Sequence, residues 1–290
     1  MKLSTPEGVE AVFNGKSNPS KDGLVVTKEE IQGLWSAPAS KTTTEERQTG
    51  NGAHDVSSGR VLYSSRTVTI PFGIATRSHE AVQKARNLIN TMMGQSDVTL
   101  TVNDGSDEFF LQGFITPAYS DKWNETTDTG SITMVCVNPE KQSTFEQYMT
   151  LLPTRGTSGG LRYGDDGQGL EYPLSYGKHE TDARNHGVLV NSGTTRAFPV
   201  ITAYGPFESL RLDWRDNTGR NQTLTYESYI GRVPLIIDTY SMSANIGGTN
   251  VSQNLGRRGF PTIPKGGDLA VTLMSAGTGW VTISSRDTYL

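Results

Sequence analysis

The sequence has little of what most chemical sites are made from. Its 290 residues contain a single cysteine, Cys136, and four histidines. One cysteine excludes a disulfide framework and a cysteine-based zinc site within one chain. Because Cys136 follows Met134 and Val135 and precedes Val137, we expect a buried thiol in a strand, where free cysteine packs as a small hydrophobe.

Long hydrophobic runs are also absent. No stretch approaches the roughly 18 apolar residues that a membrane helix needs. The opening residues, MKLSTPEGVEAVFNG, hold no continuous apolar segment of the kind found in a signal peptide. We therefore expect a chain without a membrane span or export signal, and its cysteine usage fits folding in a reducing cytoplasm.

Basic residues are not gathered into a patch. The 26 Lys and Arg residues are scattered, with Arg257–Arg258 as the one notable pair, and the formal net charge is −4. A surface that tracks phosphates needs clustered basic side chains that displace counterions. No contact with nucleic acid is expected.

Catalytic and metal-binding patterns are missing too. His54, His79, His179 and His186 have no metal-ligand spacing, and no glycine-rich phosphate loop opens a helix. A metal site in the acidic loop around His179 is one alternative, and we interpret this loop as solvated. A calcium loop at GDDGQG (164–169) is another, but the spaced carboxylates of a calcium loop are lacking, so we interpret it as a turn. We expect no active site, no metal and no cofactor.

Strand and turn residues are what the chain has in quantity. From Val188 to Leu290, short runs of Val, Ile, Thr and aromatic residues alternate with Gly, Pro, Asn and Asp. This pattern is typical of an antiparallel β-sandwich built from hairpins. The length allows two domains. We predict an α+β N-terminal domain at 1–145, a connecting segment at 146–186 and a β-sandwich at 187–290, a mostly β protein.

The N-terminal half should contain one helix, at about 78–93. Ser78 is a suitable N-cap and Gly94 a C-terminal stop. An apolar stripe with three- and four-residue spacing lies between them, formed by Ala81, Val82, Ala85, Leu88, Ile89, Met92 and Met93. We expect both methionines in the core. Residues 9–13 and 23–26 are predicted to form an opening hairpin, and 145–152 a short helix that ends before Pro153.

The segment from Ser36 to Gly59 is strongly polar and almost without apolar residues. A loop of this length is uncommon inside a compact domain and is usually functional or disordered. We predict a protruding loop whose candidate contact residues are Thr42, Glu45, Glu46, Arg47, His54 and Asp55. The alternative is a surface loop that contacts no partner.

The order of segments in the last third resembles a known family. VLVN leads into SGTTRAFPVITAYGP, VPLIID follows a polar stretch, and PKGGD introduces the closing strands. This order is similar to the C-terminal galectin-like domain of distal tail proteins of long-tailed, siphovirus-type bacteriophages. The resemblance covers roughly the last hundred residues well and the first half more loosely.

The resemblance implies a non-enzymatic virion protein with an N-terminal β-barrel-like ring domain and a galectin-like sandwich. It implies a homohexameric ring at the distal end of the tail, made in the host cytoplasm. The implied partners are the tail tube protein, the tail-tip hub or tail-associated protein, and the tape measure. It also implies that the loop at 36–59 reaches a neighbouring protomer.

A carbohydrate-binding or host-adhesion module is the alternative function. Its candidate sugar contacts are Arg211, Asp213, Trp214 and Arg215 in RLDWRD, because a pyranose stacks on an exposed ring beside hydrogen-bonding groups. Strand alternation favours the other interpretation, in which Leu210, Leu212 and Trp214 form one buried row. We also expect Trp280 in the core.

Overall fold

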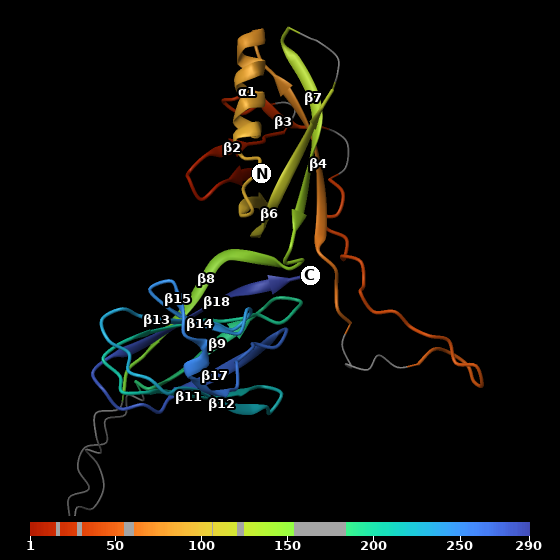
Figure 1. The fold of residues 1–290 in the computed structure, drawn as a ribbon. Coiled ribbons are helices and arrows are strands. Elements are labelled where there is room, and N and C mark those ends of the chain that lie inside the picture. The colour runs from red at the N-terminus through yellow and green to blue at the C-terminus, as the bar shows by residue number, and fades with distance from the viewer. Residues whose placement is uncertain (16–17, 28–30, 55–60, 106, 121–124, 154–183) are drawn as a thin grey trace, which may run out of the picture. The chain divides into compact units, whose positions relative to one another are not determined.

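A computed structural model describes residues 1–15, 18–27, 31–54, 61–105, 107–120, 125–153 and 184–290. The chain divides into two units, the first formed by Met1–Thr144 with Tyr289–Leu290 and the second by Phe145–Thr288 (Figure 1). Each unit has its own hydrophobic core. Within the described residues the fold is mostly antiparallel β with one α-helix, as the sequence predicts. None of the described helices is long and apolar enough to cross a membrane.

The first unit wraps its strands around one core. The strands are β1 (Lys2–Ser4), β2 (Glu10–Val12), β3 (Leu24–Val26), β4 (Arg66–Ala75), β5 (Val98–Asn103), β6 (Glu108–Tyr119), β7 (Thr127–Cys136) and the start of β8 (Lys141–Leu151). Residues 108–113 of β6 pair with β5, whereas residues 114–119 pair with β7. The strand β6 therefore takes part in two ladders. The strand order of the unit is β2-β1-β5-β6-β7-β4-β3.

The two ends of this strand order approach each other but are not joined by a ladder. A single isolated bridge, between Asn14 and Val25, links the chain after β2 to β3. The expected opening hairpin of β2 and β3 is therefore wrong. β2 pairs instead with β1, where Leu3 lies opposite Ala11, because a tight turn after Ser4 brings a nearer partner. The first unit is barrel-like without being a closed barrel.

The predicted helix is present as α1 (His79–Thr91). The Ser78 hydroxyl accepts a hydrogen bond from the Ala81 N–H at 3.3 Å, and Gly94 has a φ of 82° beyond the helix end. The buried face consists of Val82, Ala85 and Ile89, continued by Met92. Met93 is exposed, so its expected place in the core is wrong: the helix ends at Thr91 and the stripe ends with it.

The second unit is a two-layer sandwich (Figure 1). One sheet has the order β15-β14-β13-β10-β18-β8 and the other β16-β12-β11-β17-β9. The elements are β9 (His186–Asn191), β10 (Val200–Tyr204), β11 (Leu210–Asp216), β12 (Asn221–Tyr226), β13 (Leu235–Asp238), β14 (Ser243–Ile246), β15 (Thr249–Asn250), a 3-10 turn η1 (Ser252–Asn254), β16 (Leu255–Arg258), β17 (Gly267–Leu273) and β18 (Trp280–Tyr289). Inward residues alternate with outward ones in most of these strands, and the inward sets of both sheets share one core.

The segment 145–152 is not a helix. Residues up to Leu151 continue β8, which pairs with β18 in the second unit. Its Met149 and Leu151 turn toward the core, whereas Tyr148 and Thr150 are exposed. Pairing with a long neighbouring strand outweighs the weak local preference of FEQYMTL for helix. Residues 154–183, which hold GDDGQG and His179, lie outside the described residues.

Candidate functional site

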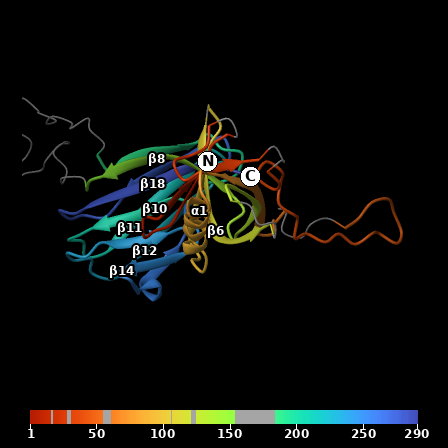
Figure 2. The same cartoon turned by 90° about the horizontal axis from the view of Figure 1, so that it is seen from above.

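Over the residues that the structure describes, the predicted protruding loop forms an extended ribbon, which we define as the arm (residues 37–54 and 61–64). It runs away from the strands of the first unit as two limbs (Figures 1 and 2). Near its base the Ser64 N–H donates to the Ala39 carbonyl at 2.8 Å, and the Lys41 N–H donates to the Leu62 carbonyl at 2.7 Å. Over the described residues, 37–54 and 61–64, the arm is therefore a hydrogen-bonded ribbon.

Four of the predicted contact residues, Glu45, Glu46, Arg47 and His54, lie toward the far end of the arm. The His54 N–H donates to the Glu45 carbonyl at 2.9 Å, and a bridge joins Glu46 to Ala53. Glu45, Glu46, Arg47 and His54 are exposed and Thr42 is half-buried, whereas Asp55 lies outside the described residues. Backbone pairing thus shapes this end and leaves its charged side chains on the surface.

A buried arginine lies at the root of the arm. Arg66, the first residue of β4, is only 1% exposed. Its Nη1 donates to the carbonyl oxygens of Ser36 at 2.6 Å and Gly33 at 2.7 Å, and lies 3.2 Å from that of Leu34. Its Nε donates to the Pro139 carbonyl at 2.7 Å. One guanidinium thus joins the start of the arm, its end and the turn between β7 and β8.

An aromatic pair and a second cation accompany Arg66. The Trp35 and Phe109 rings meet edge to face with centroids 5.4 Å apart. The Lys141 Nζ lies 5.3 Å from the Trp35 centroid and 5.5 Å from that of Phe109. Burial, followed by the nearby charge of Arg66, lowers the pKa of Lys141. Sequence reasoning missed this cluster, because its members are separated in the chain and its hydrogen-bond acceptors are backbone carbonyls.

The candidate sugar contacts in β11 divide between the two faces of their sheet. Trp214 is only 3% exposed, and its Nε1 donates to the Gly259 carbonyl at 2.6 Å. The alternation argument is confirmed, and this ring offers no platform for stacking a sugar. Arg211, Asp213 and Arg215 point to the opposite, outer face.

Asp213 organises the polar part of that outer face. Its carboxylate accepts hydrogen bonds from Arg211 at 3.0 and 3.2 Å and from the Thr223 hydroxyl at 2.7 Å. Burial alone would raise the pKa of Asp213, but the hydrogen bonds from Arg211 and Thr223 outweigh it and hold the pKa below its usual value. Arg211 and Asp213 are therefore paired with each other on this surface.

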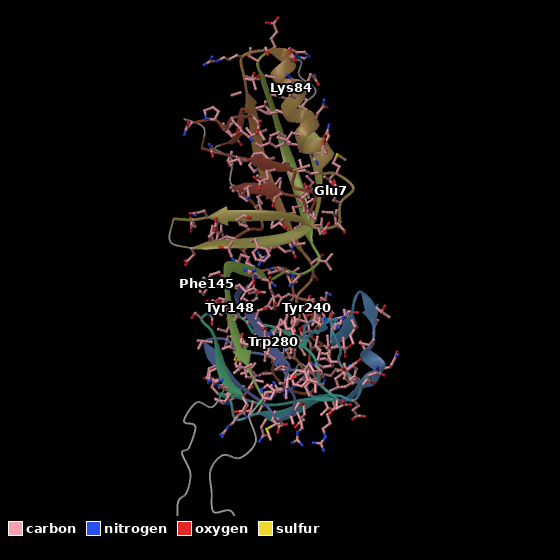
Figure 3. All side chains as sticks on the ribbon, turned by 90° about the vertical axis from the view of Figure 1, so that its left-hand side faces the viewer. Glu7, Lys84, Phe145, Tyr148, Tyr240 and Trp280 are labelled. Carbon is pink, nitrogen blue, oxygen red and sulfur yellow. The ribbon has the colours of Figure 1, made fainter. Side chains whose placement is uncertain are left out.

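The exposed tryptophan of the sandwich is Trp280, so its expected burial is wrong. It is 42% exposed, and its ring stacks on that of Tyr204, its cross-strand partner, with centroids 4.9 Å apart. Trp280, at the start of β18, is labelled in Figure 3. The neighbouring residue Val281 is buried. Because side chains alternate along a strand, Trp280 must face outward. The alternation of side chains along WVTIS (280–284) already predicts this orientation.

Outward neighbours extend this aromatic pair across the sheet. Thr282 and Thr202 lie opposite each other beside it, and Ile236 and Asn245 continue the row on β13 and β14. Ile236 is exposed and the other three are half-buried. The row carries no formal charge, unlike the arginine-bearing outer face of the other sheet.

Reactive groups are not gathered in the described parts of the chain. No group of three or more His, Cys, Asp and Glu side chains there has the arrangement of a metal site. Cys136 is fully buried in β7, as expected. Burial raises the pKa of its thiol to about 11, so it remains protonated at neutral pH and is a poor nucleophile.

Comparison with solved structures finds phage proteins of a hub adsorption apparatus and of a baseplate. The Dit protein (gp 19.1) of phage SPP1 is similar over 93% of this chain and 95% of its own, with a TM-score of 0.58 and 11% identity. A chain of the phage P2 baseplate in its activated conformation with Ca is similar over 98% and 96%, with a TM-score of 0.52 and 12% identity. The same baseplate with Sr gives a TM-score of 0.51 at 12% identity.

This chain has their fold. The SPP1 protein is described as a paradigm of the hub adsorption apparatus of phages that infect Gram-positive bacteria. No protein-family model matches the chain, and no curated protein matches it. The likeness therefore lies in the fold, across both units, at an identity too low to transfer individual residues.

Proposed function

We propose that this protein is a non-enzymatic structural subunit of a bacteriophage tail tip, a distal tail protein of a siphovirus-type phage. In this proposal, copies of the chain form a homohexameric ring between the end of the tail tube and the tail-tip hub or receptor-binding apparatus. The tube protein, the hub or tail-associated protein and the tape measure are the partners. The chain is made in the host cytoplasm and resides at the distal end of the virion tail.

The observation that carries the proposal is the likeness to the SPP1 Dit protein over nearly the whole of both chains. A fold shared only in the sandwich would be weak support, because sandwiches serve many functions. Here the likeness includes the barrel-like first unit and the sandwich in the same order. The low identity is expected of proteins selected for shape rather than for a catalytic group.

The arm supports a role in assembly. Its described residues form an extended ribbon, and Val61 and Leu62 near its base are about half exposed. Ring subunits meet through different faces on their two sides, and a projecting ribbon on one side fits such an arrangement. The contact residues proposed for a neighbouring copy are those at the far end, with Glu45, Glu46 and Arg47 at its centre.

The mass of the purified full chain in solution tests the ring. We expect native mass spectrometry and light scattering to detect a hexamer that dissociates on dilution, and negative-stain images to show rings. A chain that remains monomeric at every concentration would contradict assembly by the chain alone. Labelling intact virions with an antibody against the chain then tests its location. Label elsewhere than the distal tail end would overturn the proposal.

A second candidate function, saccharide binding, is favoured by the Tyr204–Trp280 pair. An exposed ring with neighbouring hydroxyl and amide groups suits the apolar C–H face and the hydroxyls of a neutral sugar. A glycan array comparing Trp280→Ala with Trp214→Phe tests it. Binding lost only in the Trp280 variant would support this function, and binding absent from the unaltered chain would reject it.

A further inference from the structure

We propose that Arg66 is the positioning residue of the arm: its guanidinium fixes the direction in which the arm leaves the first unit, and ring assembly depends on that direction. This inference rests on the proposed ring function and deepens it. Arg66 positions the arm through its hydrogen bonds to the arm root, and not through its charge alone.

The partners of Arg66 are of an unusual kind for a buried cation. Buried charges are normally paired with an opposite charge. Within the described part of the chain, the hydrogen-bond acceptors of Arg66 are carbonyl oxygens: three from residues 33–36, before the arm, and one from Pro139. A carboxylate would have balanced the charge without fixing the backbone, whereas these bonds fix where the chain turns.

In the described residues around the root, backbone hydrogen bonds flank the carbonyls that Arg66 binds. Gln32 and Thr69 exchange backbone hydrogen bonds at 3.0 and 3.1 Å, and Ser64 donates to Ala39 at 2.8 Å. Between these two points the carbonyls of Gly33, Leu34 and Ser36 accept hydrogen bonds from Arg66. Gly33 has a φ of 78° and lies so close to Thr67 that a Cβ there would meet its carbonyl oxygen. The chain thus turns sharply at Gly33, and Arg66 holds the turn from inside.

The shape of the guanidinium matters as much as its charge. Arginine presents its N–H donors in a planar fork, whereas the lysine ammonium is a single point with three donors. In Arg66→Lys all donors share one nitrogen. They cannot span the distance between the Pro139 oxygen and the root carbonyls as the guanidinium does. Arg66→Met keeps much of the length of the side chain and removes every donor.

The test measures arm order and assembly separately. Amide hydrogen exchange of the full chain reports the Lys41 and Ser64 amides at the arm base, and light scattering reports assembly. Ile89→Ala, a core truncation on α1 remote from the root, is the control for lost stability. We expect Arg66→Met to speed exchange at the arm base by about tenfold or more, the size set by losing hydrogen bonds to a charged group.

We also expect Arg66→Met to raise the concentration needed for half-assembly by about tenfold or more, with Arg66→Lys in between. Ile89→Ala should assemble as the unaltered chain does under conditions where it is folded. Unchanged arm exchange in Arg66→Met would overturn the inference. So would an assembly loss in Ile89→Ala equal to that in Arg66→Met at matched stability.

A variant in which a short Gly-Ser turn replaces residues 39–62 separates this inference from the ring proposal. If that variant fails to assemble and Arg66→Met assembles normally, the ring proposal stands and the positioning role is wrong. If both fail and Ile89→Ala assembles, both stand. If the unaltered chain forms no ring, the ring proposal fails, and with it the claim that assembly depends on Arg66.

Discussion

The two units bury polar groups in different ways. In the first, long charged side chains join segments that are far apart in sequence: Arg66 joins the arm root to the β7–β8 turn, and Arg86 on α1 meets Asp128 on β7 at 2.6 Å. In the second, short side chains close local turns. Asn191 is fully buried and bonds to Gly193 and Thr195 nearby, and also to Pro264.

The difference reflects which segments of each unit need side chains to fix their positions. A barrel-like wrap with a projecting ribbon has ends that its own ladders do not fix, and long side chains supply the missing connections. A two-sheet sandwich fixes its strands by pairing and by a shared core, and only its turns need polar support. Substitutions in the first unit should therefore loosen distant segments, and those in the second should act on the core or on single turns.

The largest expected effect is in the sandwich core. Trp214→Ala should lower the free energy of unfolding of the second unit by about 3–5 kcal/mol, because it leaves a large cavity and an unpaired Gly259 carbonyl. Urea denaturation, with amide exchange in each unit, would measure it. The matched control is Trp280→Ala on the outer face, expected to change stability by less than about 1 kcal/mol. Equal losses of stability in the two variants would contradict the assignment of Trp214 to the core and Trp280 to the outer face.

A smaller loss is expected at the contact between helix and sheet. Asp128 has almost no exposed side chain and pairs with the partly exposed Arg86. Asp128→Asn should cost about 2–3 kcal/mol, since it leaves the arginine charge only partly compensated. Exchange should accelerate in α1 and leave the sandwich amides unaffected. Glu80→Gln, which removes the exposed Glu80–Lys84 pair on the same helix, should have no measurable effect. A loss spread over both units would contradict a local connection.

The buried thiol makes the stability of the first unit depend on pH in the alkaline range. The pKa of Cys136 rises from an ordinary value of 9.0 to about 11 on folding, so the unfolded chain releases this proton first. Stability is complete below pH 9 and should fall by about 2 kcal/mol as the pH rises to 11. Cys136→Ala should flatten that part of the profile, relative to its own value at pH 8. A profile of unchanged slope would contradict a buried, protonated thiol.

Tyr119 contributes in the same direction at higher pH. Burial raises the pKa of its phenol from 10.0 to about 12, so this part of the stability is lost progressively as the pH rises from 10 to 12. Tyr119→Phe alongside Cys136→Ala separates the two contributions.

The smallest expected effect is at the helix N-cap. Ser78→Ala should lower the stability of the first unit by about 1 kcal/mol, because the Ala81 N–H loses its acceptor. Exchange of the first-turn amides of α1 would report it. Ser78→Asp, which restores an acceptor, should recover most of the loss. No loss in the alanine variant would show that packing alone fixes the start of this helix.

Much of the fold follows from local patterns. The cap and the stop locate α1, and alternation correctly buries Leu210, Leu212 and Trp214. The same rule applied to Val281 and Ile283 would have put Trp280 outside. The strand at Lys141–Leu151 was predicted as a helix in its second half because its pairing partners are distant in sequence. Ladder choice, as for β2, depends on which partner lies nearest in space.

The candidate sites were less predictable. The length and polarity of the arm were visible in the sequence, but its hydrogen-bonded ribbon was not. Arg66 gave no signal at all: one arginine before TVTI resembles any strand start, and its acceptors are carbonyls that every residue has. A contact made by side chain to backbone across the fold leaves no pattern of residue types to find.

The solitary, fully buried Cys136 has a practical consequence for mapping the contacts of the arm. Because its thiol is shielded and protonated, the natural chain should react very little with sulfhydryl reagents. A single cysteine introduced on the arm, such as Thr42→Cys, would then be the reactive one. A fluorophore, spin label or photo-crosslinker attached there would identify the neighbours of the arm without first removing a natural residue.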